Sequence, residues 1–290
     1  MNSSIRCEVV DDIGEFATAM RPWLDAGPPS NQVVSTILDQ RVSGVVAAEP
    51  GALWIKVLDG ADLVGAVIRT PPRGLLLTAM PDAAVAAVVE AMGGILPNAP
   101  SANGPKQTSD RFSALWSVRT GCTATAVFAS RLHEVTDVVA PNGVSGHRRP
   151  AVAADRDTVV AWLLAFAREA MASETPGLRQ LADTFESRLG AGQPQWIWEL
   201  DGRPVSFAME SPVTARTVRI QAVYTPDQHR GNGYASANVA EISTDILSRE
   251  GIEHCTLYTD LSNPVSNGVY RKLGYRPVTD MVNYGFEYPN

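Results

Sequence analysis

The sequence of 290 residues has few cysteines, and the three that it has do not form a pattern. Cys7, Cys122 and Cys255 are far apart, with no CxxC pair and no paired histidines nearby. An odd number at such spacing argues against a disulfide framework and against a zinc site. We expect no bound metal.

Long apolar runs and an excess of basic residues are also missing. No stretch approaches the roughly 20 apolar residues of a membrane helix, and the first residues lack the basic-then-apolar layout of a secretion signal. Lys and Arg number 24 against 31 Asp and Glu, a net charge of −7. Binding to nucleic acid needs a basic surface. We therefore expect a cytoplasmic protein that has neither a membrane nor a nucleic acid as partner.

The hydrophobic content of 45% suffices for one large or two medium cores. Two stretches rich in Gly, Pro and Asn predict irregular structure, Gly93–Pro105 and Ala140–Pro150. The second follows a strand-like run, Thr123–Leu132. We place the domain boundary there, giving domains 1–143 and 144–290.

The second domain alternates helical and strand patterns. Apolar residues at helical spacing predict helices, and runs of aromatic and β-branched residues predict strands. The expected helices are 154–171, 178–189, 233–249 and 264–273, and the expected strands are 195–200, 204–210, 217–224, 254–259, 275–278 and 281–288. The order ααβββαβαββ predicts an α/β fold with a mixed sheet flanked by helices.

A short repeat links the two halves. Trp54–Gly60 (WIKVLDG) and Trp196–Gly202 (WIWELDG) agree at five of seven positions, 142 residues apart. Each match is followed by two further apolar strands and by a proline before a helix, Pro81 or Pro226. The repeat predicts a duplicated domain.

A pair of glycines stands between a strand and a helix in the second half. Gly231 and Gly233 remove side chains where the backbone turns and could approach a ligand closely. Free amides at the start of the following helix, together with the helix dipole, favour a bound phosphate. The segment predicts an anion site, although a lone Gly-x-Gly does not specify the anion.

Two nucleotide motifs fit this segment poorly. A P-loop would continue Gly-Lys-Ser/Thr, but the chain reads Gly233–Tyr234–Ala235. A dinucleotide fingerprint would need a third glycine at position 236, which is Ser236, and a ribose-binding acid in a βαβ unit.

The segment does resemble motif A of the GNAT superfamily of N-acetyltransferases, Gln/Arg-x-x-Gly-x-Gly/Ala, read here as Gln228–x–x–Gly231–x–Gly233. That resemblance implies a loop whose amides hold the pyrophosphate of coenzyme A, after a strand whose splayed end binds the pantetheine arm and the acyl carbonyl. The cofactor-binding residues it implies in this segment are Val223, Tyr224, Thr225, Gln228, Arg230, Gly231, Asn232, Gly233, Tyr234 and Ala235.

A second motif of that family is matched downstream by Asn263–Tyr275 (NPVSNGVYRKLGY). The resemblance implies that Asn263 binds the pantetheine region and that Tyr270 is catalytic, donating a proton to the departing thiolate. Attack of an amine on a thioester also needs a neutral nucleophile and preorganised amides for the oxyanion. Because a phenol is a weaker acid than a thiol, Tyr270 donates late or only hydrogen-bonds the sulfur.

The general base stays open. Many family members carry a Glu on the strand before the loop, but this strand reads Arg219–Ile220–Gln221–Ala222. Glu210, Glu199 and a chain of waters are the alternatives.

The first half has no glycine pair at the matching place, where Met80–Pro81–Asp82 runs directly into a helix. It therefore resembles the degenerate partner in tandem GNAT proteins and should not hold coenzyme A in the usual way. Shaping the acceptor site, forming a homodimer and binding another ligand all stay open for it.

The functional hypothesis is an N-acyltransferase that moves an acetyl or other short acyl group from acyl-CoA to an amine in a ternary complex. A small amine, an antibiotic, a peptide N-terminus and a protein lysine stay open as acceptors. The alternatives are a non-catalytic acyl-CoA sensor or scaffold and a nucleotide-binding oxidoreductase.

Overall fold

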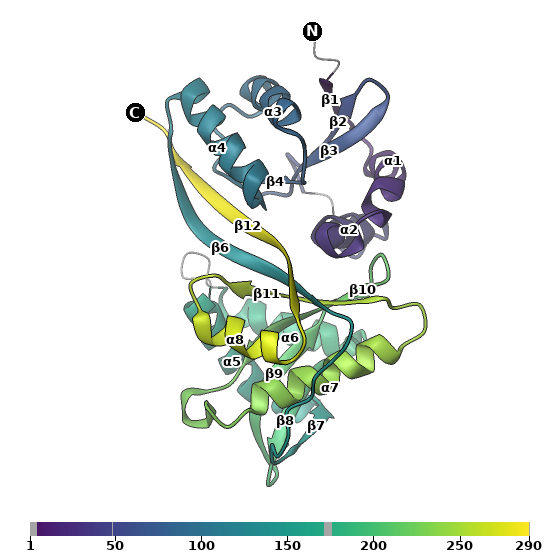
Figure 1. Ribbon diagram of the computed structural model, residues 1–290, viewed down its shortest axis with the longest axis vertical. Coiled ribbons are helices and arrows are strands. Elements are labelled where there is room, and N and C mark those ends of the chain that lie inside the picture. The colour runs from purple at the N-terminus through teal and green to yellow at the C-terminus, as the bar shows by residue number, and fades with distance from the viewer. Residues whose placement is uncertain (1–4, 48, 171–175, 290) are drawn as a thin grey trace. The chain divides into compact units, whose positions relative to one another are not determined.

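The computed structural model describes residues 5–47, 49–170 and 176–289. The chain forms two compact units: unit 1 consists of Met1–Leu132 and Pro277–Asn290, and unit 2 of His133–Arg276. The sequence analysis placed one boundary between residues 143 and 144. The structure divides the chain at two points instead, because the last strand returns to unit 1 (Figure 1).

Both halves of the chain contain the same elements in the same order, βααβββαβαβ. The first half contains β1 (Ile5–Val9), α1 (Ile13–Asp25), α2 (Pro28–Val42), β2 (Leu53–Asp59), β3 (Asp62–Arg69), β4 (Leu75–Leu77), α3 (Asp82–Ile95), β5 (Ser101–Pro105), α4 (Lys106–Thr120) and β6 (Thr123–Val135). The second contains β7 (His147–Pro150), α5 (Arg156–Ala170), α6 (Leu178–Gly190), β8 (Gln195–Leu200), β9 (Arg203–Glu210), β10 (Thr217–Tyr224), α7 (Tyr234–Ser248), β11 (His254–Asp260), α8 (Pro264–Lys272) and β12 (Arg276–Glu287), with 3₁₀ turns at Ala153–Asp155 and Asp227–His229.

The sheets are mixed, as the sequence predicted. In unit 1 the strands lie in the order β1-β2-β3-β4-β5-β12-β6, and in unit 2 the order is β11-β10-β9-β8-β7. The pairs β4–β5 and β10–β11 are parallel. The neighbours β1–β2, β2–β3, β8–β9, β9–β10 and β5–β12 are antiparallel.

Helices cover both faces of each sheet. In unit 1, α3 and α4 lie on one side of the strands, and α1 and α2 lie on the other (Figure 1). Ile55 and Val57 pack under α3 and α4, whereas Trp54 packs under α1 and α2, as strand alternation requires. In unit 2, Val218 and Ile220 pack under α7 and α8, whereas Phe207 packs under α5 and α6. Burying each of these large apolar side chains contributes about 1.5–3 kcal/mol to folding.

Three sequence predictions were wrong. Gly93–Pro105 is not irregular throughout, since it completes α3 and forms β5. Gly104 suits that strand because a Cβ there would lie 2.7 Å from the carbonyl oxygen of Leu77. Residues 275–278 and 281–288 are not two strands but parts of the single strand β12. Within Ala140–Pro150, the last four residues form β7.

No described helix has the length and apolar character needed to cross a membrane.

Candidate active site

The glycine pair lies where the sequence analysis predicted, between β10 and α7. Gly231 and Gly233 have φ angles of 81° and 82°, which L side chains rarely adopt. Gly233 is the N-cap of α7. A Cβ on Gly233 would also lie 3.1 Å from Val144, so glycine is needed there for space as well as for conformation.

The N-terminus of α7 carries no side-chain cap and no acidic residue in its first turn. The side-chain amide of Asn232 donates to the backbone carbonyls of His229 and Arg230 at 3.1 and 3.2 Å. The side chain of Tyr234 packs against the cluster of Trp198, Val205 and Ala237. Both side chains thus hold the loop, and the first amides of the helix remain available to an anion.

The strands β10 and β11 separate beside this loop. Their parallel pairing runs from Thr217–His254 to Ile220–Leu257. Yet β10 continues to Tyr224 and β11 to Asp260. Among the described residues, the last four of β10 have no recorded partner on β11, so their backbone groups on that side can bind a ligand.

A bulge accompanies the separation. Ala222 has a φ of 51°, and the register of β10 against β9 shifts between Gln221 and Tyr224. The hydroxyl of Ser206 donates to the Tyr224 carbonyl at 3.0 Å, and the hydroxyl of Thr225 donates to Ser206 Oγ at 2.9 Å. These bonds fix the end of β10, where Val223, Tyr224 and Thr225 were predicted to flank the acyl arm.

Arg230 joins the loop to α5. Its Nη2 lies 2.7 Å from Glu169 Oε2, and its Nη1 lies 2.8 Å from Asp227 Oδ1. Its Nε donates to the Thr225 carbonyl at 2.9 Å. The Tyr224 hydroxyl donates to the other oxygen of Glu169 at 3.3 Å. Burial and then the Glu169 carboxylate raise the pKa of Tyr224. Sequence reasoning missed Glu169 because it lies 61 residues from Arg230.

The two residues of the downstream motif have different settings. Asn263 is exposed and caps α8 by accepting from the Ser266 amide at 3.0 Å. Tyr270 is 8% exposed, and its ring meets that of Tyr275 edge-on at 5.8 Å. Burial raises the pKa of Tyr270 to about 12, although a hydrogen bond with Ser266 acts in the opposite direction.

Residues 157–275 match the model of the acetyltransferase (GNAT) family. Residues 157–275 are a GNAT domain. They include the loop, both separating strands, Asn263 and Tyr270.

Solved structures share this fold at low sequence identity. A GCN5-related N-acetyltransferase from Sphaerobacter thermophilus is 15% identical with a TM-score of 0.65, covering 99% of this chain and 97% of its own. A GNAT-family acetyltransferase from Colwellia psychrerythraea is 12% identical with a TM-score of 0.61, covering 97% and 100%. A tandem GNAT protein from the clavulanic acid biosynthesis pathway is 14% identical with a TM-score of 0.58, covering 99% of each chain. No curated protein matches the sequence.

The two carboxylates considered as general bases in the GNAT domain are held by ion pairs. Glu210 is 1% exposed, forms a bidentate pair with Arg249, and accepts from Trp196 Nε1 at 2.6 Å. It lies opposite Ile220, at the paired part of β10. Glu199 lies 2.5 Å from Arg149. Both oxygens of Glu210 accept hydrogen bonds from its two partners, Arg249 and Trp196.

Unit 1 differs from the GNAT domain at the matching place. There, β4 and β5 are paired at Leu75–Ala102 and Leu76–Asn103. The Leu77 carbonyl lies so close to Gly104 that a Cβ there would be 2.7 Å from its oxygen. Pro81 is the N-cap of α3. Among the described residues of unit 1, these two strands therefore show no separation like that of β10 and β11.

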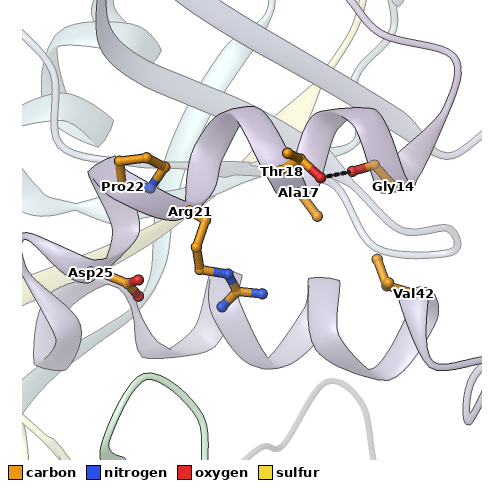
Figure 2. A pocket seen from close by; sticks show the side chains of 7 residues that line it. All are labelled: Gly14, Ala17, Thr18, Arg21, Pro22, Asp25 and Val42. Atoms are coloured by element: carbon orange, nitrogen blue, oxygen red, sulfur yellow. Dashed lines mark hydrogen bonds between the residues drawn. The ribbon is translucent and has the colours of Figure 1, made fainter.

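Unit 1 has a hollow of its own between α1 and α2, of about 480 Å³ (Figure 2). Arg21 projects from α1 into the space between the two helices, and Asp25 lies farther along α1. Arg21 pairs with Asp39 at 2.6 Å. The hollow is lined by Gly14, Ala17, Thr18, Arg21, Pro22, Asp25 and Val42. None of these residues belongs to the predicted site. No group of three or more His, Cys, Asp or Glu side chains suited to a metal occurs in the part of the chain that the structure describes.

Proposed function

We propose that the GNAT domain is an N-acyltransferase that moves an acetyl or other short acyl group from acyl-CoA to an amine. The observation that carries this proposal is the uncapped N-terminus of α7, preceded by two left-handed glycines, directly after the separating end of β10. An uncapped helix start suits a pyrophosphate, and unpaired strand groups suit an amide-bearing pantetheine arm.

The residues of the site then have distinct roles. The amides from Gly231 to Ala235 bind the pyrophosphate, with Arg230 and Gln228 at its side. The backbone of Val223, Tyr224 and Thr225 holds the acyl arm, and an amide there stabilises the oxyanion. Asn263 binds the pantetheine chain from the start of α8.

The reaction is direct attack of a neutral amine on the thioester carbonyl, after which the C–S bond breaks and the thiolate leaves. Tyr270 lies on α8 and donates its hydroxyl proton, or a hydrogen bond, to that sulfur. The proton that the amine nitrogen loses on amide formation passes through water, and it either restores the Tyr270 phenol or reaches the thiolate, so that the products are the amide and the free thiol. Because the pKa of Tyr270 is raised to about 12, the phenol stays neutral throughout the working range and remains a donor.

Tyr270→Phe tests this role. We expect kcat to fall about tenfold, with the KM for the acyl-CoA nearly unchanged, since the hydroxyl acts on the leaving group. Free-thiol release across a panel of amines, comparing wild type with the variant, measures both. Acetyl-CoA binding without turnover of any amine would favour the non-catalytic sensor. Calorimetry showing NAD binding but no coenzyme A binding would favour the oxidoreductase.

Tyr270 also gives a pH prediction. The pKa of the buried phenol is higher in the folded protein than its ordinary value of about 10, which applies to the unfolded chain. Below pH 10 the phenol is therefore protonated in both states, and the stability that it contributes is fully present. This stability is lost as the pH rises through the folded value of about 12. Urea unfolding at pH 9 and pH 11 should show a smaller pH-dependent loss in Tyr270→Phe than in the wild type.

Glu169→Gln should strengthen acyl-CoA binding. In the free protein Glu169 partly neutralises Arg230, and both side chains are about half exposed. Releasing Arg230 to a pyrophosphate is therefore expected to lower the Kd by about two- to fourfold. Calorimetry with acetyl-CoA measures it. Glu186→Gln is the control, because Glu186 is similarly exposed and pairs with Arg156, away from the loop. Weaker binding in Glu169→Gln alone would show that Glu169 supports the site.

We further propose that unit 1 holds no acyl-CoA. This is supported by the closed β4–β5 pair and by the direct start of α3 after Pro81. One acyl-CoA site per chain is expected, which the stoichiometry of the same titration checks.

A further inference from the structure

Arg219 stands on β10 and faces away from α7. Its neighbours Val218 and Ile220 belong to the cluster under α7 and α8. Alternation along the strand directs Arg219 to the other face, which α5 and α6 cover. That face also carries Tyr224 with Glu169 and Trp162 of α5 beside it.

The guanidinium of Arg219 lies where the strands separate. Its Nη2 donates to Gln221 Oε1 at 3.4 Å, and its central carbon lies 5.8 Å from the centre of the Tyr258 ring. The last ladder pair is Ile220–Leu257. Gln221 and Tyr258 are therefore the first residues beyond the paired region on β10 and β11, and the guanidinium of Arg219 lies close to both.

Among the residues that the structure describes, this charge has no carboxylate partner. Within the described residues, no ion pair of Arg219 is recorded, although acidic residues outnumber basic ones in the chain. Two other arginines of the same unit are paired with carboxylates: Arg149 with Asp155 and Glu199, and Arg249 with Glu210 and Asp245. Arg188 instead donates to the backbone carbonyls of Pro194 and Glu210, which leaves it no free access to a ligand oxygen through that nitrogen. A neutral amide at 3.4 Å and a ring compensate a guanidinium poorly.

Arg219 is partly buried. Burial lowers the pKa of its guanidinium, and the electrostatic interaction with Tyr258 acts in the opposite direction. The side chain nevertheless retains some exposed surface. A guanidinium that is partly desolvated, accessible and unpaired is well suited to bind an oxyanion, and its planar fork matches a carboxylate.

We propose that Arg219 binds a carboxylate carried by a substrate at the point where β10 and β11 separate. This rests on the proposed function, which brings the acyl arm and the acceptor together there. The carboxylate belongs either to the acceptor, as in an amino acid, or to the acyl group, as in succinyl-CoA. Both sources use the same chemistry, and the experiment separates them.

The test compares wild type, Arg219→Gln and Arg216→Gln by calorimetry. Arg216 is the matched control because it precedes the same strand but is exposed and paired with Glu253. One arm titrates amino acids against their carboxamides, with and without coenzyme A. The other arm titrates succinyl-CoA against acetyl-CoA.

We expect the wild type and Arg216→Gln to bind the carboxylate member of at least one arm about tenfold or more tightly. In Arg219→Gln this preference should fall to about twofold or less. Its melting temperature should be equal to or above that of the wild type, because an unpaired charge is removed. Thus a lost preference cannot be attributed to misfolding. The arm in which the preference occurs identifies the source of the carboxylate.

Two results would overturn the assignment: no preference in either arm of the wild type, or a preference that survives in Arg219→Gln. The proposed function fails by a different result, the absence of binding by either acyl-CoA. The amino acid arm without coenzyme A still tests Arg219 in that case.

Discussion

Gly231→Ala is expected to weaken acetyl-CoA binding by about tenfold or more, the cost of roughly one to two hydrogen bonds to an anion. At this position the backbone has a φ of 81°, and a Cβ would meet no atom of the protein within 4 Å. The methyl group would thus project into open space at the loop that precedes α7, where the pyrophosphate is proposed to bind. Calorimetry with acetyl-CoA gives the Kd.

Gly251→Ala provides a control with matched strain. Gly251 has a φ of 77°, and a Cβ there also meets nothing within 4 Å. Both substitutions should therefore cost about 1 kcal/mol of stability through the same left-handed conformation. Gly251 follows the other end of α7, so its variant should keep wild-type affinity. Equal loss of affinity in both variants would attribute the effect to strain and contradict a pyrophosphate site at Gly231.

The part of the site that the sequence predicted depends on local backbone chemistry. Gly231 and Gly233 were identified because a sharp turn before a helix needs residues that tolerate positive φ, and both adopt it. Tyr270 and Asn263 came from a motif on one short helix. The burial of these two residues could not be predicted from the motif, because the burial of Tyr270 depends on Tyr275 and on the strands beneath α8.

Contacts between distant parts of the chain were not predictable. β5 contains Asn103 and Gly104, which are poor strand formers, and its partner β12 lies about 180 residues later in the chain. The link from Glu169 to Arg230 and Tyr224 has no local pattern either. For the strand that carries Arg219, the sequence showed only that the Glu found there in many family members is absent. The unpaired charge of Arg219 at the strand separation required the register of β10 and β11.

Arg249→Met is expected to lower the free energy of unfolding by about 3 kcal/mol, because it leaves a buried carboxylate without its counter-ion. Arg249 is the C-cap residue of α7, and its two terminal nitrogens lie 2.6 and 2.9 Å from the oxygens of Glu210. Glu210 is 1% exposed and also binds Trp196. Urea denaturation at pH 7 measures the change.

Arg216→Met is the control for losing an arginine. Its pair with Glu253 is about half exposed on both sides, so its removal should cost about 1 kcal/mol or less. The double variant Glu210→Gln/Arg249→Met should recover part of the stability lost in Arg249→Met, since no unpaired charge remains. Equal losses for the two arginines would contradict the buried pair.

The same pair decides whether Glu210 is the general base. If its role is to hold β9 against α7, Glu210→Gln should keep kcat within about threefold of wild type when assayed well below the melting temperature. A base would lose about a hundredfold or more under the same conditions. Because both oxygens of Glu210 are bonded within the core, and because Glu210 lies beside the paired part of β10 rather than its open end, we expect the first result. Proton removal from the acceptor would then occur before the amine reaches the site or through water.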